Sequence, residues 1–371
     1  MLLKQSPQKW LFPLSGGLIL LGLILGLSFG WDKAGIPCIL GSLGLALGLQ
    51  FTPNMQRFSF TLVIFSAVLA SLFYPAPFLR WGSFELKSLI IPILMLIMFG
   101  MGISMSLKDF WGVIRMPKAV LVGLICQFTL MPIIGWSLAT LSGLSAPIAA
   151  GIILVGCSPS GLASNVMAYI AKANLALSLT LTMVATLLAP IMTPFLMKLL
   201  ADQLVPIDFL AMLWSISKIV IIPVILGLIF NHFAHGKFPW LDKAMPLLSM
   251  GGIALVITII TAAGRDSLLE IGLLLVLVVL VHNSLGYLLG YWSSRLLGMD
   301  RASARTIAFE VGMQNSGLAS GIALEMGRVA SMGLAPAVFG PLMNVTGSSL
   351  AAFWRDRGSE TIPDDSSSNE D

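Results

Sequence analysis

Apolar stretches long enough to cross a lipid bilayer recur along almost the whole chain. A helix of about 20 apolar residues spans the hydrocarbon layer. Twelve such stretches are present, the second and third of them short, at residues 12–30, 36–51, 59–74, 88–106, 118–140, 146–171, 174–200, 208–231, 244–263, 267–292, 303–326 and 330–354. Only 10% of the 371 residues are charged, against roughly a quarter in a soluble domain. The sequence therefore predicts an all-α polytopic membrane protein.

Basic residues are distributed unequally between the two sides of the predicted bundle. With twelve spans, fourteen Lys and Arg residues fall on the side that holds both chain ends, six fall on the other, and Lys218 lies inside a span. Cytoplasmic loops are enriched in Lys and Arg, so we expect a multi-pass protein of the inner (plasma) membrane with both termini in the cytoplasm. For Lys218 we favour a side chain that extends to the membrane surface over a substrate contact.

Several function classes lack the residues that they need. The formal net charge of +4 follows from this loop bias and does not indicate nucleic-acid binding. The sequence has no G-x-x-x-x-G-K-[ST] motif for ATP and no G-x-S-x-G nucleophile elbow, and its three cysteines and three histidines are scattered. We therefore expect neither an enzyme, an ATP-driven pump nor a transition-metal protein. A ligand-sensing receptor is a further class, for which the short loops offer no signalling domain.

A five-residue sequence occurs twice. Ser-Gly-Leu-Ala-Ser stands at 160–164 and again at 316–320, in the middle of the sixth and the eleventh predicted spans. Spans that lie five apart cross the membrane in opposite directions, as they do in transporters built from two inverted repeats. Chance recurrence in a chain rich in Gly and Ala is the alternative. We expect two inverted five-helix repeats.

Both copies lie beside residues that interrupt helices. Pro159 removes a backbone donor and clashes with the preceding turn, and Gly161 lowers the cost of non-helical backbone. The second copy follows Gly312 and a run of polar residues. An interrupted helix is tolerated in a bilayer where it lines a cavity or binds an ion. We therefore predict two broken helices, with a simple proline kink as the alternative for the first.

Glu310 is an ionisable residue inside a predicted span. A carboxylate at that depth is costly and faces a partner or a water-filled site. Other side chains with oxygen atoms lie in the predicted spans: Gln127, Ser178, Thr182, Gln314 and Asn315. Ser178 and Thr182 share one helix face because they are four residues apart. Such ligands suit a hard cation such as Na⁺; for any single Ser or Thr, a hydrogen bond to its own helix is the alternative.

Around these residues the chain resembles the bile acid:sodium symporter family, including its bacterial members. The resemblance covers roughly residues 59–354 and is strongest in Ser164-Asn165, in the Ala-Leu-Ser-Leu-Thr-Leu-Thr stretch that follows, and in Glu310-Val311-Gly312-Met313-Gln314-Asn315. It implies a ten-helix transporter unit with two broken helices that cross. A panel would comprise about 59–106 and 208–263, and a core about 118–200 and 267–354. Residues 1–58 would form an extra N-terminal transmembrane hairpin, and 355–371 a disordered acidic tail.

The resemblance also implies binding sites for two sodium ions and a substrate. The first sodium site would consist of Ser164, Asn165, Ser178, Thr182 and Glu310. The second would consist of Gln127, Glu310 and Gln314 with the carbonyls of Val311 and Met313. Asn315, Ser316 and Asn344 would contact the substrate. No cofactor is implied, because the two Na⁺ ions are co-substrates.

From this resemblance we expect a secondary active transporter in the lipid bilayer that couples symport of a small organic anion to sodium, without nucleic acid or ATP. The anion would be bile-acid-like or a small carboxylate such as pantoate, pyruvate or another keto acid. Relatives often have polar residues where Leu162 and Leu342-Met343 stand, so we expect a less polar substrate cavity. A proton-coupled or uncoupled carrier, in which Glu310 would carry a proton, is the alternative.

Overall fold

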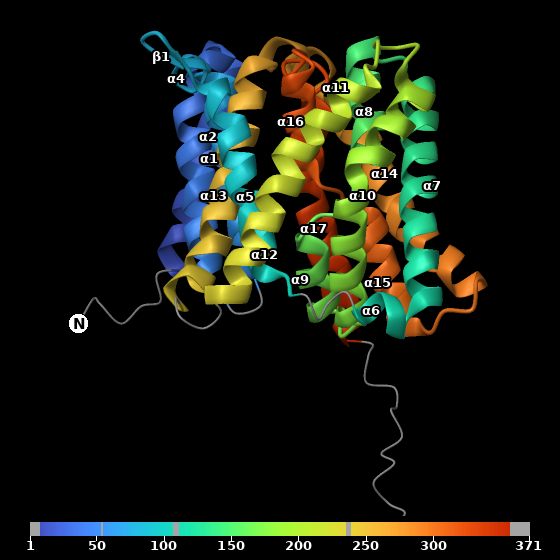
Figure 1. Cartoon of the computed structure of the whole chain (residues 1–371). Helices are drawn as coiled ribbons and strands as arrows, with labels where there is room; N and C mark the ends of the chain where they lie inside the picture. Colours follow the sequence, from blue (N-terminus) through green and yellow to red (C-terminus); the bar gives the residue numbers. More distant parts are fainter. Residues whose placement is uncertain (1–7, 53–54, 107–110, 235–238, 357–371) are drawn as a thin grey trace, which may run out of the picture.

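The computed structural model describes residues 8–52, 55–106, 111–234 and 239–356, and these form an almost entirely helical bundle (Figure 1). The helices are α1 (Gln8–Phe29), α2 (Gly35–Gln50), α3 (Ser59–Phe73), α4 (Ala76–Leu79), α5 (Ile90–Ser104), α6 (Trp111–Arg115), α7 (Pro117–Leu141), α8 (Ala146–Cys157), α9 (Ala163–Ile170), α10 (Leu175–Ala201), α11 (Phe209–Ile216), α12 (Ile222–Ala234), α13 (Pro239–Ala263), α14 (Arg265–Leu296), α15 (Arg301–Gly312), α16 (Ser316–Glu325) and α17 (Leu334–Asp356). Strands β1 (Arg80–Trp81) and β2 (Phe84–Glu85) form a short antiparallel ladder. Residues 357–371 of the predicted tail lie outside the described residues.

The helices have the length and composition of membrane spans. Within the described ranges, six are both long and apolar enough to cross a bilayer: Trp10–Phe29, Leu86–Ser104, Pro117–Leu141, Leu175–Ala201, Phe209–Phe233 and Arg265–Leu296. Gly35–Gln50, Ser59–Phe73, Ala146–Cys157 and Leu247–Ala263 are shorter apolar helices. Each predicted apolar stretch coincides with a helix or with consecutive helices, which confirms the prediction of an all-α polytopic membrane protein.

Two groups of helices lie side by side in the bundle, as Figure 1 shows. In one group, α13 packs against α3 and α5, and α12 packs against α5. The other group contains α7, α8, α10, α14, α15 and α17. The groups contact each other where α17 packs against α3 and α13. This arrangement provides the two bodies that a panel and a core require, although their exact division stays a prediction.

The first two helices form a hairpin that packs on the group containing α3. α1 packs on α2, and α2 packs on α3. Buried hydroxyls connect the second of these pairs: Ser66 donates to Ser42 at 2.7 Å, and Ser59 donates to the Ala46 carbonyl at 2.7 Å. Hydrogen bonds between small polar residues, with the close approach that such residues allow, stabilise helix pairs in lipid. The hairpin is therefore attached to α3.

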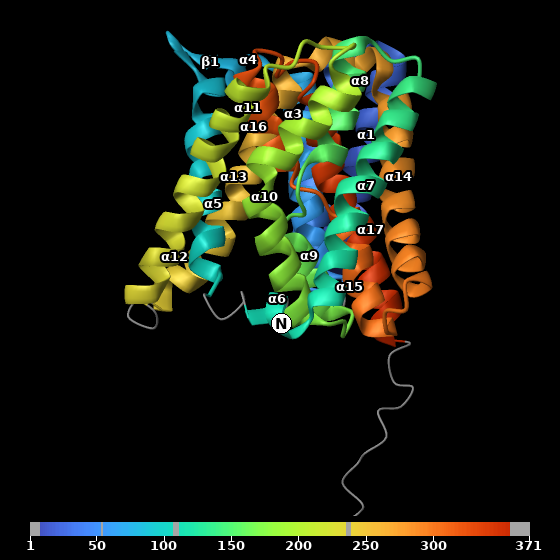
Figure 2. The same ribbon diagram turned by 45° about the vertical axis from the view of Figure 1, so that its right-hand side comes forward.

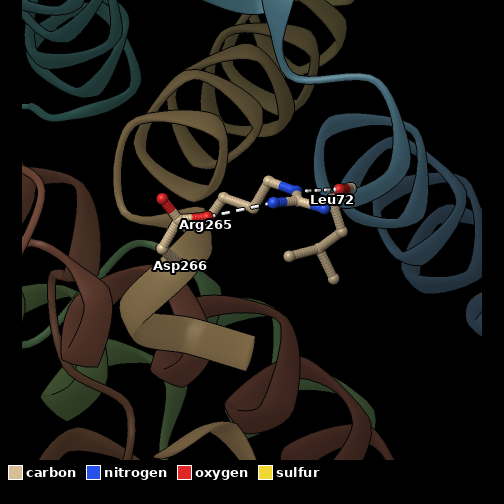
Figure 3. A network of polar contacts seen from close by, with 3 residues as sticks. All are labelled: Leu72, Arg265 and Asp266. Carbon is tan, nitrogen blue, oxygen red and sulfur yellow. Dashed lines mark hydrogen bonds and ion pairs between the residues drawn. The ribbon is translucent and has the colours of Figure 1, made fainter. Parts of the chain in front are cut away.

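Arg265 connects the start of α14 to the end of α3 (Figure 3). Its Nε donates to the Leu72 carbonyl at 2.5 Å, and its Nη1 pairs with Asp266 at 2.9 Å. The last carbonyls of a helix have no partner within that helix, so the guanidinium satisfies one of them. α3 ends beside α4 at one end of the bundle, whereas α1 begins and α17 ends at the opposite end (Figure 1).

Gly102 on α5 and Gly227 on α12 let two backbones touch. A Cβ atom on Gly227 would lie 2.8 Å from the Gly102 Cα, and a Cβ atom on Gly102 would lie 2.9 Å from the Gly227 Cα. We expect Gly227→Ala to separate the two helices and to cost about 1–3 kcal/mol of stability, seen as a lower midpoint of thermal unfolding in detergent. Gly251→Ala is the control, since a Cβ atom there meets open space. Equal midpoints for the two variants would contradict the prediction.

Candidate cation and substrate site

Two segments of the chain are interrupted inside the bundle. α8 ends at Cys157 and α9 begins at Ala163, while α15 ends at Gly312 and α16 begins at Ser316. We call residues 158–162 the first break and residues 313–315 the second break. In both views α8 and α16 lie towards one end of the bundle and α9 and α15 towards the other, so the two segments run in opposite directions (Figures 1 and 2).

The two breaks pair with each other through their backbones. Ser160 and Gln314 form an antiparallel bridge. The Gly161 amide donates to the Met313 carbonyl at 3.0 Å, and the Asn315 amide donates to the Pro159 carbonyl at 2.8 Å. Lipid offers no partners for free backbone groups, so each break supplies donors and acceptors that the other needs. A simple proline kink does not describe the first break, because the chain leaves helical geometry over residues 158–162.

The carboxylate of Glu310 lies beside these breaks and accepts hydrogen bonds from four hydroxyls. Its Oε1 is 2.6 Å from the Oγ of Ser164 and 2.6 Å from the Oγ of Ser178. Its Oε2 is 2.6 Å from the Oγ of Ser160 and 2.9 Å from the Oγ1 of Thr182. Glu310 is only 2% exposed. Together with Asn165, these residues form what we call the carboxylate cluster, which contains every residue predicted for the first sodium site.

The carboxylate cluster has more close oxygen pairs than hydroxyl protons. The single proton of Ser178 faces two acceptors, because its Oγ is also 2.8 Å from Asn165 Oδ1. Thr182 Oγ1 lies within 3.2 Å of that oxygen and of both carboxylate oxygens. A hydroxyl donates one hydrogen bond, so with the Oδ1 of Asn165 facing Ser178 and Thr182, some of these oxygen pairs have no proton between them. A bound cation would remove the resulting repulsion, and a set of oxygen ligands suits a hard cation.

Gln127 and Gln314, which we call the amide pair, contact each other beside the carboxylate cluster. The Nε2 of Gln127 donates to Gln314 Oε1 at 2.8 Å and lies 2.9 Å from the Ser158 carbonyl. The Nε2 of Gln314 donates to the Val311 carbonyl, and the Met313 carbonyl accepts from the first break. Of the predicted second site, the structure thus brings Gln127, Gln314 and the Val311 carbonyl into contact. Among the described contacts, however, those of the Glu310 carboxylate go to the carboxylate cluster and not to the amide pair.

The three predicted substrate residues lie at the start of α16 and on α17. Asn315 caps α16, since its Oδ1 accepts from the Leu318 amide at 3.0 Å. Ser316 is buried against α17, where a Cβ atom on Gly340 would lie 2.7 Å from its Oγ. Asn344, half-buried, donates to the Gly340 carbonyl of its own helix at 2.9 Å. Ser316 and Asn344 therefore both lie next to Gly340.

Several residues of the site were not predicted. Ser160 belongs to the repeated pentapeptide, yet it was assigned no role as a ligand. Asn283 on α14 donates to the carbonyl of Gly312, the residue before the second break, and Thr346 on α17 donates to Asn283; a lone amide within an apolar span, as at Gln127, was the available signal. Lys218 lies in a π-helical turn, Ser217–Ile221, with its exposed side chain 5.6 Å from the Trp214 ring. It is in no described contact with the carboxylate cluster.

Two interrupted helices of opposite direction that meet around a buried carboxylate define a class, the secondary transporters with broken helices. Comparison with known proteins specifies the class further. Residues 91–271 match the model of the Sodium Bile acid symporter family. The chain is 41% identical over 300 residues to an "Uncharacterized sodium-dependent transporter YocS" of Bacillus subtilis (81% of this chain, 91% of that protein). The chain belongs to the Sodium Bile acid symporter family.

Plant proteins are more distant relatives. The chain is 33% identical over 267 residues to the "Probable sodium/metabolite cotransporter BASS1, chloroplastic" of Arabidopsis thaliana. The matched region covers 72% of this chain and 67% of that protein. It is 35% identical over 268 residues to the "Probable sodium/metabolite cotransporter BASS2, chloroplastic" of Oryza sativa subsp. japonica, covering 71% of this chain and 62% of that protein. These names describe transporters and not enzymes.

Proposed function

We propose that this protein is a symporter that couples the movement of a small organic anion across a membrane to the movement of sodium. The observation that carries the proposal is the carboxylate cluster, in which a buried Glu310 and the oxygens around it have fewer protons than close contacts require. A monovalent hard cation matches one carboxylate among neutral oxygens. The names of the relatives, which include sodium-dependent and sodium/metabolite transporters, agree with this choice of cation.

Two sodium ions would bind per transport cycle. The first would be held by Ser164, Asn165, Ser178, Thr182 and Glu310, with Ser160 as an additional ligand. The second would be held by Gln127, Glu310, Gln314 and the carbonyls of Val311 and Met313, and the single negative charge of Glu310 would offset one of the two positive charges. The second ion requires the amide pair to rotate, because its amide groups now satisfy each other and the Val311 carbonyl. Binding at the second site would therefore be coupled to a local rearrangement.

The anion would bind where the half-helices begin. The amino end of a helix carries a partial positive charge, and α9 and α16 both begin at the paired breaks. Asn315, Ser316 and Asn344 lie at the start of α16 or near it and offer polar groups to a carboxylate. Leu162 directly precedes α9 and Leu342 lies two residues before Asn344, and we expect both to favour small carboxylates with an apolar body. Sodium that fixes the breaks would stabilise anion binding, and the anion would stabilise sodium binding by the same factor.

Movement of one helix group against the other would expose this site to each side in turn. We propose that the two interrupted segments belong to two inverted repeats of five helices, that residues 59–106 and 208–263 form the panel, and that residues 118–200 and 267–354 form the core. The hairpin within residues 1–58 would belong to the panel, because α2 packs on α3. The protein would lie in the inner (plasma) membrane with both termini in the cytoplasm, a proposal that the charges of the loops support.

Uptake into vesicles tests the proposal and the choice of ion. We expect an inward sodium gradient to drive uptake of a small carboxylate by vesicles that contain the purified protein, and a proton gradient alone to leave uptake at the level without a gradient. Candidate anions come from a thermal-unfolding screen of carboxylates with and without sodium, since a bound ligand stabilises the native state. Uptake driven by protons and indifferent to sodium would support the proton-coupled carrier instead.

A further inference from the structure

Asn283 on α14 is a fully buried amide that contacts Gly312, the residue before the second break, and belongs to neither proposed sodium site. Its Nδ2 donates to the Gly312 carbonyl at 2.8 Å. Gly312 is the last residue of α15, so this carbonyl has no partner within its own helix, and lipid supplies none. The two helices approach closely here, because a Cβ atom on Gly286 of α14 would lie 3.0 Å from the Gly312 Cα.

The partners of Asn283 fix the direction of its amide. A carbonyl only accepts hydrogen bonds, so the Nδ2 must face Gly312 and the Oδ1 must face Thr346 on α17, whose Oγ1 is 2.5 Å away. The Thr346 hydroxyl is therefore the donor in that contact. The Tyr287 hydroxyl, 3.4 Å from the same Oγ1, donates to the Met343 carbonyl. An ordered series of hydrogen bonds thus runs from Thr346 through Asn283 to the end of α15.

Gln127 makes the corresponding contact at the first break. Its Nε2 lies 2.9 Å from the carbonyl of Ser158, the residue that follows α8. α7, which carries Gln127, precedes the first interrupted segment as α14 precedes the second. The two amides differ in their other contact, since Gln127 contacts Gln314 of the proposed second sodium site whereas Asn283 contacts Thr346. Asn283 therefore holds a carbonyl at the end of a helix, as Gln127 does, but it is not placed to bind the ion itself.

We propose that Asn283, oriented by Thr346, is a positioning residue for the second sodium site. The Gly312 carbonyl lies between those of Val311 and Met313, the two carbonyls that the second ion requires. By holding Gly312, Asn283 keeps the neighbouring carbonyls at the spacing that a small cation needs, although it does not touch the ion itself. This inference rests on the proposed function, because a positioning role has meaning only if the second break binds sodium.

Removal of one hydroxyl tests the inference with little change of shape. In the purified protein, we expect Thr346→Val to raise the sodium concentration for half-saturation of radioactive sodium binding by about five- to tenfold, as an unfixed buried amide would allow. Thr346→Ser keeps the hydroxyl and should stay within about twofold of the wild type. Thr258→Val is the matched control, because the buried Thr258 hydroxyl bonds only to the Ala254 carbonyl of its own helix among the described contacts. Asn283→Leu should weaken sodium binding at least as much as Thr346→Val.

The outcomes separate this inference from the proposed function. Wild-type sodium affinity in Thr346→Val, or equal losses in Thr346→Val and Thr258→Val, would overturn the positioning role. The proposed function would still be supported in that case, provided that the wild type binds sodium and Glu310→Gln does not. A wild-type protein that binds no sodium, with potassium as the reference ion, would overturn both. Near wild-type sodium affinity in Thr346→Ser, together with weak binding in Thr346→Val, would support the inference. A general loss of packing would affect both variants, whether or not the hydroxyl is kept.

Discussion

Sodium-dependent uptake is expected to disappear when Glu310 is replaced by glutamine. The side chain keeps its size, and the surrounding hydroxyls can turn to accept from the new amide, so the protein should still fold. The substitution removes the one negative charge that offsets the positive charge of the cation. Because a charge pair in a poorly screened site contributes several kcal/mol, sodium affinity should fall by at least about 100-fold. Radioactive sodium binding and uptake into vesicles measure the effect directly.

Glu270 supplies the matched control for this experiment. It lies on α14 and is exposed, so Glu270→Gln removes the same charge from the chain without touching the carboxylate cluster. Uptake by that variant should equal the wild type. Sodium-driven uptake that persists in Glu310→Gln at the wild-type rate would refute the assignment of this carboxylate to the cation site.

Replacing Gln314 with leucine is expected to remove the second sodium ion and to spare the first. Leucine has a similar volume but no oxygen, so the second site loses a ligand while the carboxylate cluster keeps all of its hydroxyls. The Hill coefficient for sodium in uptake should fall from about two to about one, because cooperation between two ions is lost. A sodium titration of the initial uptake rate provides this number.

A double variant shows whether the amide pair acts as a unit. Gln127 and Gln314 are in direct contact, at 2.8 Å, and effects of contacting residues do not add. Gln127→Leu with Gln314→Leu should therefore weaken sodium binding little more than Gln314→Leu alone. An additive loss in the double variant, or a Hill coefficient that stays at the wild-type value in Gln314→Leu, would show that the pair does not share an ion.

The parts of this structure that were predictable from sequence follow from local rules. The lengths of the apolar stretches correspond to helices because backbone groups in lipid must bond within their own segment. Pro159 and Gly161 marked the first interruption, and Gly312 marked the second, through their own backbone chemistry. Ser178 and Thr182 were placed on one face by helical spacing alone, and both contact Glu310. Sodium binding at these residues stays a prediction.

The unpredicted parts depend on distances between helices. Ser160 lies in a non-helical stretch, where no periodicity fixes the direction of a side chain, so its contact with Glu310 could not be derived. Asn283 lies in a helix that runs from Arg265 to Leu296, and which of its faces meets the second break is decided by packing. The attachment of the N-terminal hairpin to α3 likewise depends on contacts between helices that the hydropathy of each helix does not encode.

The contact between Arg265 and Leu72 has a consequence for how this family could be studied through its alignments. The acceptor is a main-chain oxygen, which every amino acid presents, so position 72 is free to change without loss of the bond. Of the two side chains, only that of Arg265 takes part in the bond. Two positions that depend on each other in this way leave no correlated substitutions, and a method that infers proximity from paired changes would not detect that α3 and α14 are joined here.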